Sequence, residues 1–432
     1  MAKSDETLER ATVRKVAWRL LPLIALGYGI AFIDRVNISF ASLQMNRDLH
    51  FSATVYGLGA GLFFVSYAAL EVPSNLMLVR FGARRWMARI MLTWGLLAAG
   101  MMFVRTPMHF YLMRFALGAA EAGFFPGVIY YLNQWFPANH RGRAISRFYI
   151  AAPLSGVVMG GVAGTLLGLH GHMGLAGWQW LFLVEGLPAV LISLIFLLFL
   201  PDEPASVTWL TAAEKAWLQM RIAADQALAT ASGDHNVFKA LLDPRVLAFT
   251  AVNFFYLGSY YAFNLSAPAV LQAATGLNTA NVGYLVSAGG LAGAAGMIFI
   301  GWHSDLRRER YLHLAVPLMV VAACFAVMAF AHGPVVIAAT YLVFMAAYFA
   351  VSGAFWTVPG EIIDPRSLAV AVAAINGLGQ VGSFLMPFAW GIVRDATGDF
   401  HAGLTALIVP YVLGAVIVLF LRRDHKRRLA AA

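Results

Sequence analysis

The chain has 432 residues, of which 60% are hydrophobic and only 12% are charged, and its mean hydropathy is +0.73. Soluble domains average about 25% charged residues, so this composition excludes a soluble enzyme and indicates a membrane protein. The single cysteine, Cys324, excludes a disulfide framework and a cysteine metal site. The distribution of the net charge of +9 indicates membrane topology rather than nucleic-acid binding.

Twelve apolar stretches reach the length of about 20 residues that crosses the hydrocarbon core of a bilayer. The polar segment 201–245 divides them six and six, and Thr211 with Glu214 forms a capping box that predicts a short helix there. We therefore expect an all-α membrane protein with twelve transmembrane helices in two pseudo-symmetric six-helix bundles. Its expected parts are an N-terminal bundle (1–200), a cytoplasmic linker with an amphipathic helix (201–245) and a C-terminal bundle (246–432). The spans lie near 18–42, 55–79, 86–105, 109–132, 145–168, 178–200, 246–272, 281–302, 312–331, 335–360, 367–393 and 402–421.

Basic residues gather on one side of these spans. With the N-terminus inside, 25 of the 30 lysines and arginines fall on the cytoplasmic side. The positive-inside rule then places both termini in the cytoplasm. The polar start of the chain and its long first apolar stretch predict that this stretch stays in the membrane and is not cleaved as a signal peptide.

Four charged residues interrupt the first and fourth spans: Asp34, Arg35, Arg114 and Glu121. A charge at mid-membrane costs about 2.5–3.5 kcal/mol even on the most lenient scale, so these residues indicate a functional site. Arg114 and Glu121 are two helical turns apart and share one face. We expect Asp34 and Arg35 near the level of Arg114, in one cluster with Glu121.

This cluster predicts a division of roles. Arg35 suits the carboxylate of an incoming anion, because a guanidinium binds a planar carboxylate with two parallel hydrogen bonds. Asp34 and Glu121 are expected to take up and release the coupling proton, and Arg114 to set their protonation by proximity. A permanent salt-bridge cluster that only fixes helix packing is the alternative.

The second half has no basic residue inside a span, so we expect it to contribute uncharged substrate contacts. The candidates are Tyr261, Asn264, Trp356, Asn376 and Gln380, each with helix packing as the alternative. Two further carboxyls are set apart from the cluster: Glu71 is expected at an inner gate and Glu185 in a structural hydrogen bond.

Two short basic turns close the second and eighth spans, at 75–85 and 301–310. They look like degenerate copies of the loop motif Gly-x-x-x-Asp-Arg-x-Gly-Arg-Arg of the major facilitator superfamily. Within it, the chain resembles the anion:cation symporter family, in the bacterial branch of tartrate, hydroxyphenylacetate and sugar-acid transporters. The residues that carry this resemblance are Asp34-Arg35, 71–75, 114–127 and 177–188.

The resemblance implies a proton-coupled symporter that imports a small organic anion by alternating access, in a bacterial inner membrane. It places substrate contacts at Tyr67, Trp356 and Asn376. The anion classes it leaves open are a hydroxy-dicarboxylate such as tartrate, a sugar acid and an aromatic carboxylate. Phe32 stands where sugar-acid carriers tend to have tyrosine, and Ser266 where this branch often has tryptophan, which argues against a polyhydroxylated acid.

The same composition is compatible with other functions. An anion exchanger, a uniporter or a sodium-coupled carrier of this fold remains an alternative. A membrane enzyme is disfavoured because all eleven histidines fall in loops or at span ends. A drug antiporter is disfavoured because Arg35 repels cations. We expect no cofactor or metal, protons as the coupling ion, membrane lipid as a neighbour, no nucleic-acid partner and a monomer.

Overall fold

The computed structural model describes residues 2–230, 242–359, 363 and 368–431. All regular elements in these ranges are helical, and twelve helical segments are long and apolar enough to cross a membrane. The predicted all-α architecture with twelve spans is therefore confirmed. The first half contains α1 (Ala2–Asp48), α2 (Ala53–Phe81), α3 (Ala83–Gly100), η1 (Met101–Phe103), α4 (Pro107–Glu121), α5 (Phe124–Trp135), α6 (Ala138–Tyr149), α7 (Ala151–Gly168), η2 (His172–Gly174) and α8 (Gly177–Phe199).

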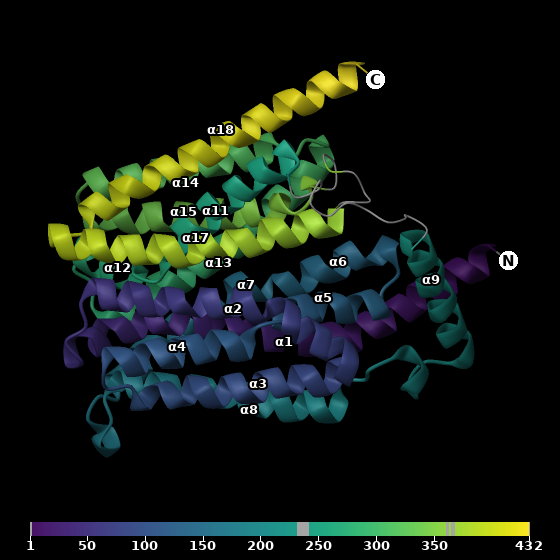
Figure 1. Ribbon diagram of the computed structural model, residues 1–432, viewed down its shortest axis with the longest axis horizontal. Helices are drawn as coiled ribbons and strands as arrows, with labels where there is room; N and C mark the ends of the chain where they lie inside the picture. The colour runs from purple at the N-terminus through teal and green to yellow at the C-terminus, as the bar shows by residue number, and fades with distance from the viewer. Residues whose placement is uncertain (1, 231–241, 360–362, 364–367, 432) are drawn as a thin grey trace.

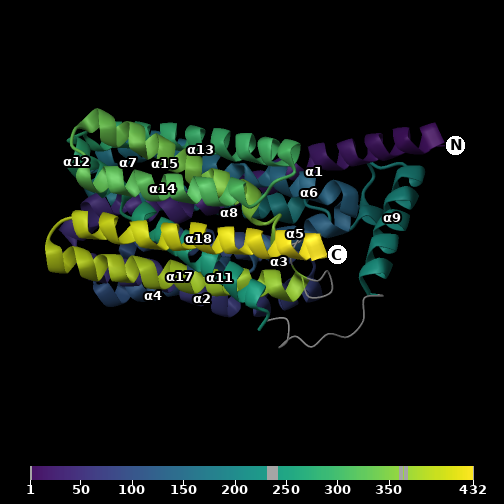
Figure 2. The same cartoon turned by 90° about the horizontal axis from the view of Figure 1, so that it is seen from above.

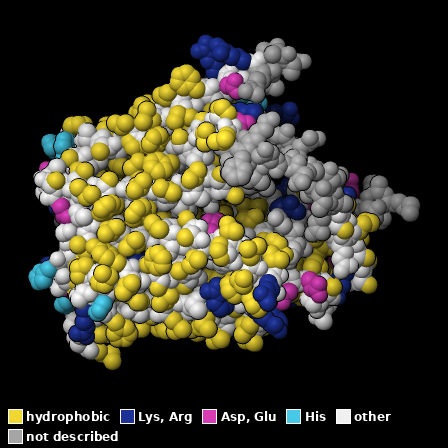
Figure 3. Space-filling model, viewed as in Figure 1, with side chains coloured by type: hydrophobic (Ala, Val, Ile, Leu, Met, Phe, Trp, Pro, Cys, Tyr) yellow, Lys and Arg dark blue, Asp and Glu magenta, His cyan; other side chains and the backbone are white. Residues whose placement is uncertain are grey.

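The second half lies beside the first as a separate layer in Figure 1, with α2 packed along α17 and α7 along α13. Hydrophobic side chains cover most of the face shown in Figure 3, and the charged ones lie mainly toward its two ends. After the segment with η3 (Pro204–Ser206) and α9 (Ala212–Thr230), the chain forms α11 (Pro244–Asn264), α12 (Ala267–Thr275), α13 (Thr279–Arg307), α14 (Leu312–Phe330), α15 (Pro334–Phe355), α17 (Leu368–Thr397) and α18 (His401–Ala431).

Local sequence signals set several helix starts. The Ser52 hydroxyl accepts a hydrogen bond from Val55 N (3.2 Å) at the start of α2, and Asn278 caps α13 in the same way. At α4, Thr106 caps the helix and Pro107 occupies its first position, where the missing N–H needs no partner. These polar residues end the short loops between spans.

The fourth span is broken, although the sequence predicted one helix over 109–132. Helix α4 ends at Glu121, Gly123 adopts a left-handed conformation (φ 86°), and α5 begins at Phe124. The backbone here lies against Ser74 of α2, so closely that a Cβ on Gly123 would lie 2.6 Å from the Ser74 Cβ. A residue without a side chain is therefore needed where the two helices meet.

Two further spans each consist of two consecutive helices, which the length of the apolar stretch did not indicate. Helix α11 ends at Asn264 and the chain turns into the separate α12, where a single span over 246–272 was expected. The fifth span consists of α6 and α7, which meet at Ile150. Hydropathy marks the length of an apolar stretch and not a change of direction inside it.

At one end of the molecule, where α1 ends and α2 begins, polar contacts join the two halves. We call this the closed end. The carboxylate of Asp395 on α17 accepts hydrogen bonds from the backbone N–H groups of Ala53 (2.9 Å) and Thr54 (2.8 Å) at the start of α2. The Tyr56 hydroxyl of α2 donates to the Leu265 carbonyl (2.7 Å), and the Ser287 hydroxyl of α13 to the Val157 carbonyl (2.7 Å).

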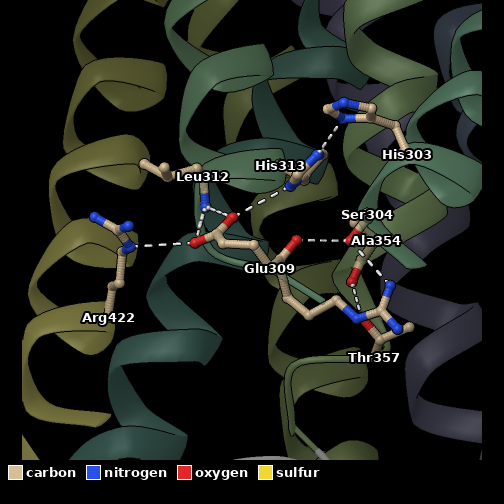
Figure 4. A network of polar contacts seen from close by, with 9 residues as sticks. His303, Ser304, Glu309, Leu312, His313, Ala354, Thr357 and Arg422 are labelled. Carbon is tan, nitrogen blue, oxygen red and sulfur yellow. Dashed lines mark hydrogen bonds and ion pairs between the residues drawn. The ribbon is translucent and has the colours of Figure 1, made fainter. Parts of the chain in front are cut away.

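Both chain termini lie at the opposite end (Figure 1), which also carries the two basic turns. In the second turn, the Glu309 carboxylate accepts from Leu312 N (3.0 and 2.8 Å) and from Nε of Arg422 on α18 (3.1 Å), as Figure 4 shows. His313 contacts Glu309 (3.2 Å) and also His303 on α13 (2.7 Å). The Glu309 carboxylate thus links α14 to α18, and His313 extends the network to α13.

The polar segment after α8 docks on the first half at this same end, where α9 crosses beside the start of α1 (Figure 2). The predicted capping box is present, with Thr211 N donating to Glu214 (2.8 Å) and Glu214 N to the Thr211 hydroxyl (3.3 Å). Glu214 also pairs with Lys15 of α1 (2.6 Å). Burial raises the pKa of Glu214, but the bonds from Lys15 and Thr211 outweigh it and hold this pKa below its usual value. The expected linker extends into residues 231–241, which lie outside the described ranges.

Candidate functional site

A buried ion pair links α1 to α4 near the centre of the first half. Nε of Arg35 donates to Oε1 of Glu121 (2.8 Å), and Nη2 of Arg35 contacts the same oxygen. The Glu121 side chain is fully buried, and 12% of the Arg35 side chain is exposed. The other oxygen of Glu121 has no hydrogen-bond partner among the described residues. The pair is therefore accessible from the arginine side only.

The break in the fourth span positions the carboxylate of this pair. Glu121 is the last residue of α4, and the chain turns at Gly123 before α5 begins. Discontinuous helices of this kind are a recurrent feature of substrate sites in membrane transporters. Arg35 was expected near the level of Arg114, and both guanidinium groups lie against the Phe63 ring, 5.6 and 4.9 Å from its centroid.

Asp34 and Arg114 form a second buried group on the same two helices. Asp34 is 3% and Arg114 2% exposed. Asp34 accepts a hydrogen bond from Asn37 (3.2 Å), and Arg114 donates to the Ala60 carbonyl (3.4 Å). Their opposite charges attract each other without a direct hydrogen bond, and Oδ2 of Asp34 has no partner among the described residues.

Arg35 faces a central cavity of about 790 Å³, part of it open to solvent, between the two halves. Its wall comes from α1, α2, α5 and α6 on one side and from α11, α15 and α17 on the other. Eighteen described residues line it, and Arg35 is the only charged one among them. Asp34, Arg114 and Glu121 lie behind this wall.

Most residues predicted to contact substrate do line this cavity. Tyr67 lies under the guanidinium of Arg35, with the ring centroid 5.1 Å from Cζ. The other predicted contacts in the lining are Tyr261, Trp356, Asn376 and Gln380. Trp356 follows α15 and is 38% exposed, so the cavity opens toward the end that carries the chain termini.

Asn264 is the exception. It was expected beside Tyr261, but it is the last residue of α11, is buried, and does not line the cavity. It lies three residues beyond Tyr261, where α11 ends and the chain turns into α12. In this conformation the structure does not bring Asn264 to the site.

The sequence did not predict two features of the cavity. Twelve of its eighteen lining residues are aromatic, including Tyr256, Tyr260 and Tyr348 of the second half. Tyr256 and Tyr260 are one helical turn apart, a spacing visible in the sequence. The second feature is Glu71, whose carboxylate accepts a hydrogen bond from the Asn376 amide (3.3 Å) and so connects α2 with α17. Glu71 was expected at a gate, and this bond does join the two halves.

Comparison with known proteins identifies the fold. Residues 24–387 match the family model described as Major Facilitator Superfamily. The chain belongs to this superfamily. It is therefore a multi-pass membrane transporter rather than an enzyme, and its substrate is a small molecule.

Relatives in this superfamily resemble the chain along almost its whole length. The chain is 40% identical to a protein of Agrobacterium vitis named "Putative tartrate transporter", over 97% of this chain and 93% of the relative. It is 38% identical to a "Quinolone resistance transporter" of Acinetobacter baumannii, over 95% and 94%. Among solved structures, a bacterial homologue of the human lysosomal transporter Spinster, in an inward-facing and unoccupied conformation, has the same fold. Its TM-score is 0.71, at 18% identity over 95% of this chain and 96% of that one.

Proposed function

We propose that this superfamily member is a proton-coupled symporter that imports a small organic anion by alternating access. The observation that carries the proposal is the Arg35–Glu121 pair at the wall of the central cavity. A carboxylate that enters the cavity offers Arg35 a partner of the same chemistry as Glu121. Arg35 can therefore release the Glu121 carboxylate and bind the carboxylate of the substrate in its place.

This exchange couples the anion to a proton. When Arg35 turns to the substrate, the Glu121 carboxylate loses its cation while it remains fully buried. An isolated buried carboxylate is strongly disfavoured, so Glu121 then binds a proton. Linkage makes the effect reciprocal, because a proton on Glu121 frees Arg35 and favours anion binding. Asp34 is proposed as a second proton carrier, and Arg114 as the charge that tunes both carboxyls.

Alternating access requires the closed end to open. The polar contacts that join the halves there centre on Asp395 and Tyr56, and α2 and α17 also pack closely, with Gly391 against Ala53. Along the rest of the α7–α13 contact, glycines let the helices approach closely, with Gly160 against Gly283. We propose that both termini are cytoplasmic, as the positions of the basic residues indicate, so that the cavity here opens inward. The proposed location is a bacterial inner membrane, where the protein acts as a monomer.

The tartrate name of the Agrobacterium relative supports an organic anion as substrate. An anion exchanger, a uniporter and a sodium-coupled carrier of the same fold remain the alternatives. The name of the Acinetobacter relative and the aromatic cavity favour export of an aromatic compound as a second candidate. Arg35 argues against a cationic one.

A two-step experiment tests the proposal. Tartrate, gluconate and benzoate are first screened for thermal stabilisation of the purified protein and of Arg35→Ala, because a ligand that binds the folded state raises its apparent stability. The best stabiliser is then followed in proteoliposomes with an acidic exterior. We expect accumulation that collapses on addition of an uncoupler. Uptake that persists in the presence of the uncoupler and requires sodium would show a different coupling ion. Proton-driven efflux without uptake would show an exporter.

A further inference from the structure

The two walls of the cavity differ in a way that narrows the substrate. On the wall of the second half, four rings lie nearly parallel in one row. Tyr260 and Tyr348 are stacked with centroids 3.7 Å apart and planes 7° apart, Tyr348 and Tyr256 at 4.7 Å and 18°, and Tyr256 and Phe355 at 5.9 Å and 17°. Such a row suits a flat ligand ring, because aromatic rings prefer offset-stacked or edge-to-face contacts with one another.

Several polar groups on this wall form hydrogen bonds within the protein. The Tyr256 hydroxyl is bonded to the Tyr348 carbonyl (3.1 Å) and to the Ser352 hydroxyl (2.6 Å). The Asn253 amide donates to the Ile375 carbonyl (2.8 Å), and the Asn376 amide to Glu71 (3.3 Å). Oε1 of Gln380 has no partner among the described residues, and Tyr260, Tyr261 and Tyr348 add hydroxyl groups to this wall.

The cavity also holds a single positive charge. Arg35 is the only charged residue among the described residues of its wall, and Arg114 lies behind that wall with its guanidinium against Phe63 (4.9 Å to the ring centroid). One guanidinium compensates one carboxylate. A second carboxylate on the same ligand would be buried against aromatic rings without a cation, which is strongly disfavoured.

We infer that the transported anion is an aromatic monocarboxylate, with its carboxylate on Arg35 and its ring in contact with the aromatic wall around the Tyr260–Tyr348 stack. This inference rests on the proposed function, since it names the anion for the same site. It separates this chain from a carrier of tartrate, which has two carboxylates.

Calorimetric titration of the purified protein tests the inference with four probes. Benzoate and cyclohexanecarboxylate have the same carbon skeleton and charge, and differ in aromaticity; terephthalate adds a second carboxylate to benzoate; tartrate has two carboxylates and no ring. We expect benzoate to bind about three- to tenfold more tightly than cyclohexanecarboxylate, as stacking energies imply, and more tightly than terephthalate and tartrate.

A matched pair of variants assigns the effect to the cavity. Trp356→Leu removes the exposed ring of the wall and should reduce the preference for benzoate over cyclohexanecarboxylate. Trp302→Leu makes the same change at an exposed tryptophan of α13 outside the cavity and should leave that preference unchanged.

The outcomes separate this inference from the function on which it rests. Tighter binding of tartrate or terephthalate, or equal binding of benzoate and cyclohexanecarboxylate, overturns the aromatic monocarboxylate and leaves an Arg35-dependent anion carrier intact. If no probe binds, or if binding is equal in Arg35→Ala, the proposed function itself fails.

Discussion

The two walls of the central cavity use different chemistry. The wall of the first half has a guanidinium at its surface and a buried carboxylate behind it, with Asp34 and Arg114 deeper still. The described part of the wall from the second half carries no charge and presents a row of aromatic rings and three amides. Both walls face the same space, but only one of them can change its protonation.

This difference indicates that proton coupling depends on the first wall and ligand selection on the second. The first-half wall can hold an anion on Arg35 and a proton on Glu121 at the same time, because Arg35 has two possible partners. The second-half wall can select a ligand by shape and by ring stacking, and its chemistry does not change with protonation at neutral pH. We therefore expect large effects on both anion binding and proton coupling from changes to the first wall, and small effects on ligand selectivity from changes to the second.

The largest effect should come from Arg35→Ala. It removes two charge-assisted hydrogen bonds to the anion, each worth about 1.5–3 kcal/mol, so affinity should fall by at least about 100-fold. Calorimetric titration with benzoate measures it. Arg47→Ala is the matched control, because Arg47 is on the same helix with a side chain 74% exposed. Retained affinity for benzoate in Arg35→Ala would show that the first wall does not hold the anion through this arginine.

Glu121→Gln should separate transport driven by protons from exchange. The amide keeps the size of the side chain but cannot carry the proton, so accumulation against a gradient should lose the whole coupling, about 5- to 150-fold in typical linked systems. Counterflow exchange in proteoliposomes should be much less affected. Glu203→Gln, at an exposed carboxyl, is the control. An equal loss in both assays would show that Glu121 binds the substrate.

Gly123→Ala tests how the first wall is built. The left-handed backbone costs about 1–2 kcal/mol for a residue with a Cβ, and the Ser74 side chain adds a steric clash. Thermal unfolding should shift to a lower temperature. Gly168→Ala, where a Cβ meets open space, should not show this loss. A Gly123→Ala protein as stable as the parent would show that the break in the span does not need glycine.

The smallest effect should come from Asn376→Ala on the second wall. It removes one neutral amide and its 3.3 Å bond to Glu71, so affinity for benzoate should change by about two- to tenfold. Proton-driven accumulation of the bound anion should persist. A loss as large as that of Arg35→Ala would show that the second wall also carries the anion charge.

The sequence predicted what depends on composition. Twelve apolar lengths predicted the twelve spans, and charges inside the first and fourth spans pointed to Arg35 and Glu121. It did not predict which charges pair, because the rotation of each helix about its axis is set by packing against its neighbours. The bond from Asn376 to Glu71 and the exclusion of Asn264 from the cavity depend on that rotation. The sequence indicated part of the aromatic row, through the spacing of Tyr256 and Tyr260. It did not indicate their partner Tyr348, because this residue comes from a helix distant in the chain.

Proton uptake on anion binding is the most direct test of the central claim, that one arginine exchanges Glu121 for the substrate. Purified protein in weak buffer is mixed with saturating benzoate at neutral pH, and a pH-indicator dye reports protons taken up. The account predicts about one proton per anion bound, and none for Glu121→Gln, which should still bind benzoate. Benzoate binding to the parent protein without proton uptake would contradict it.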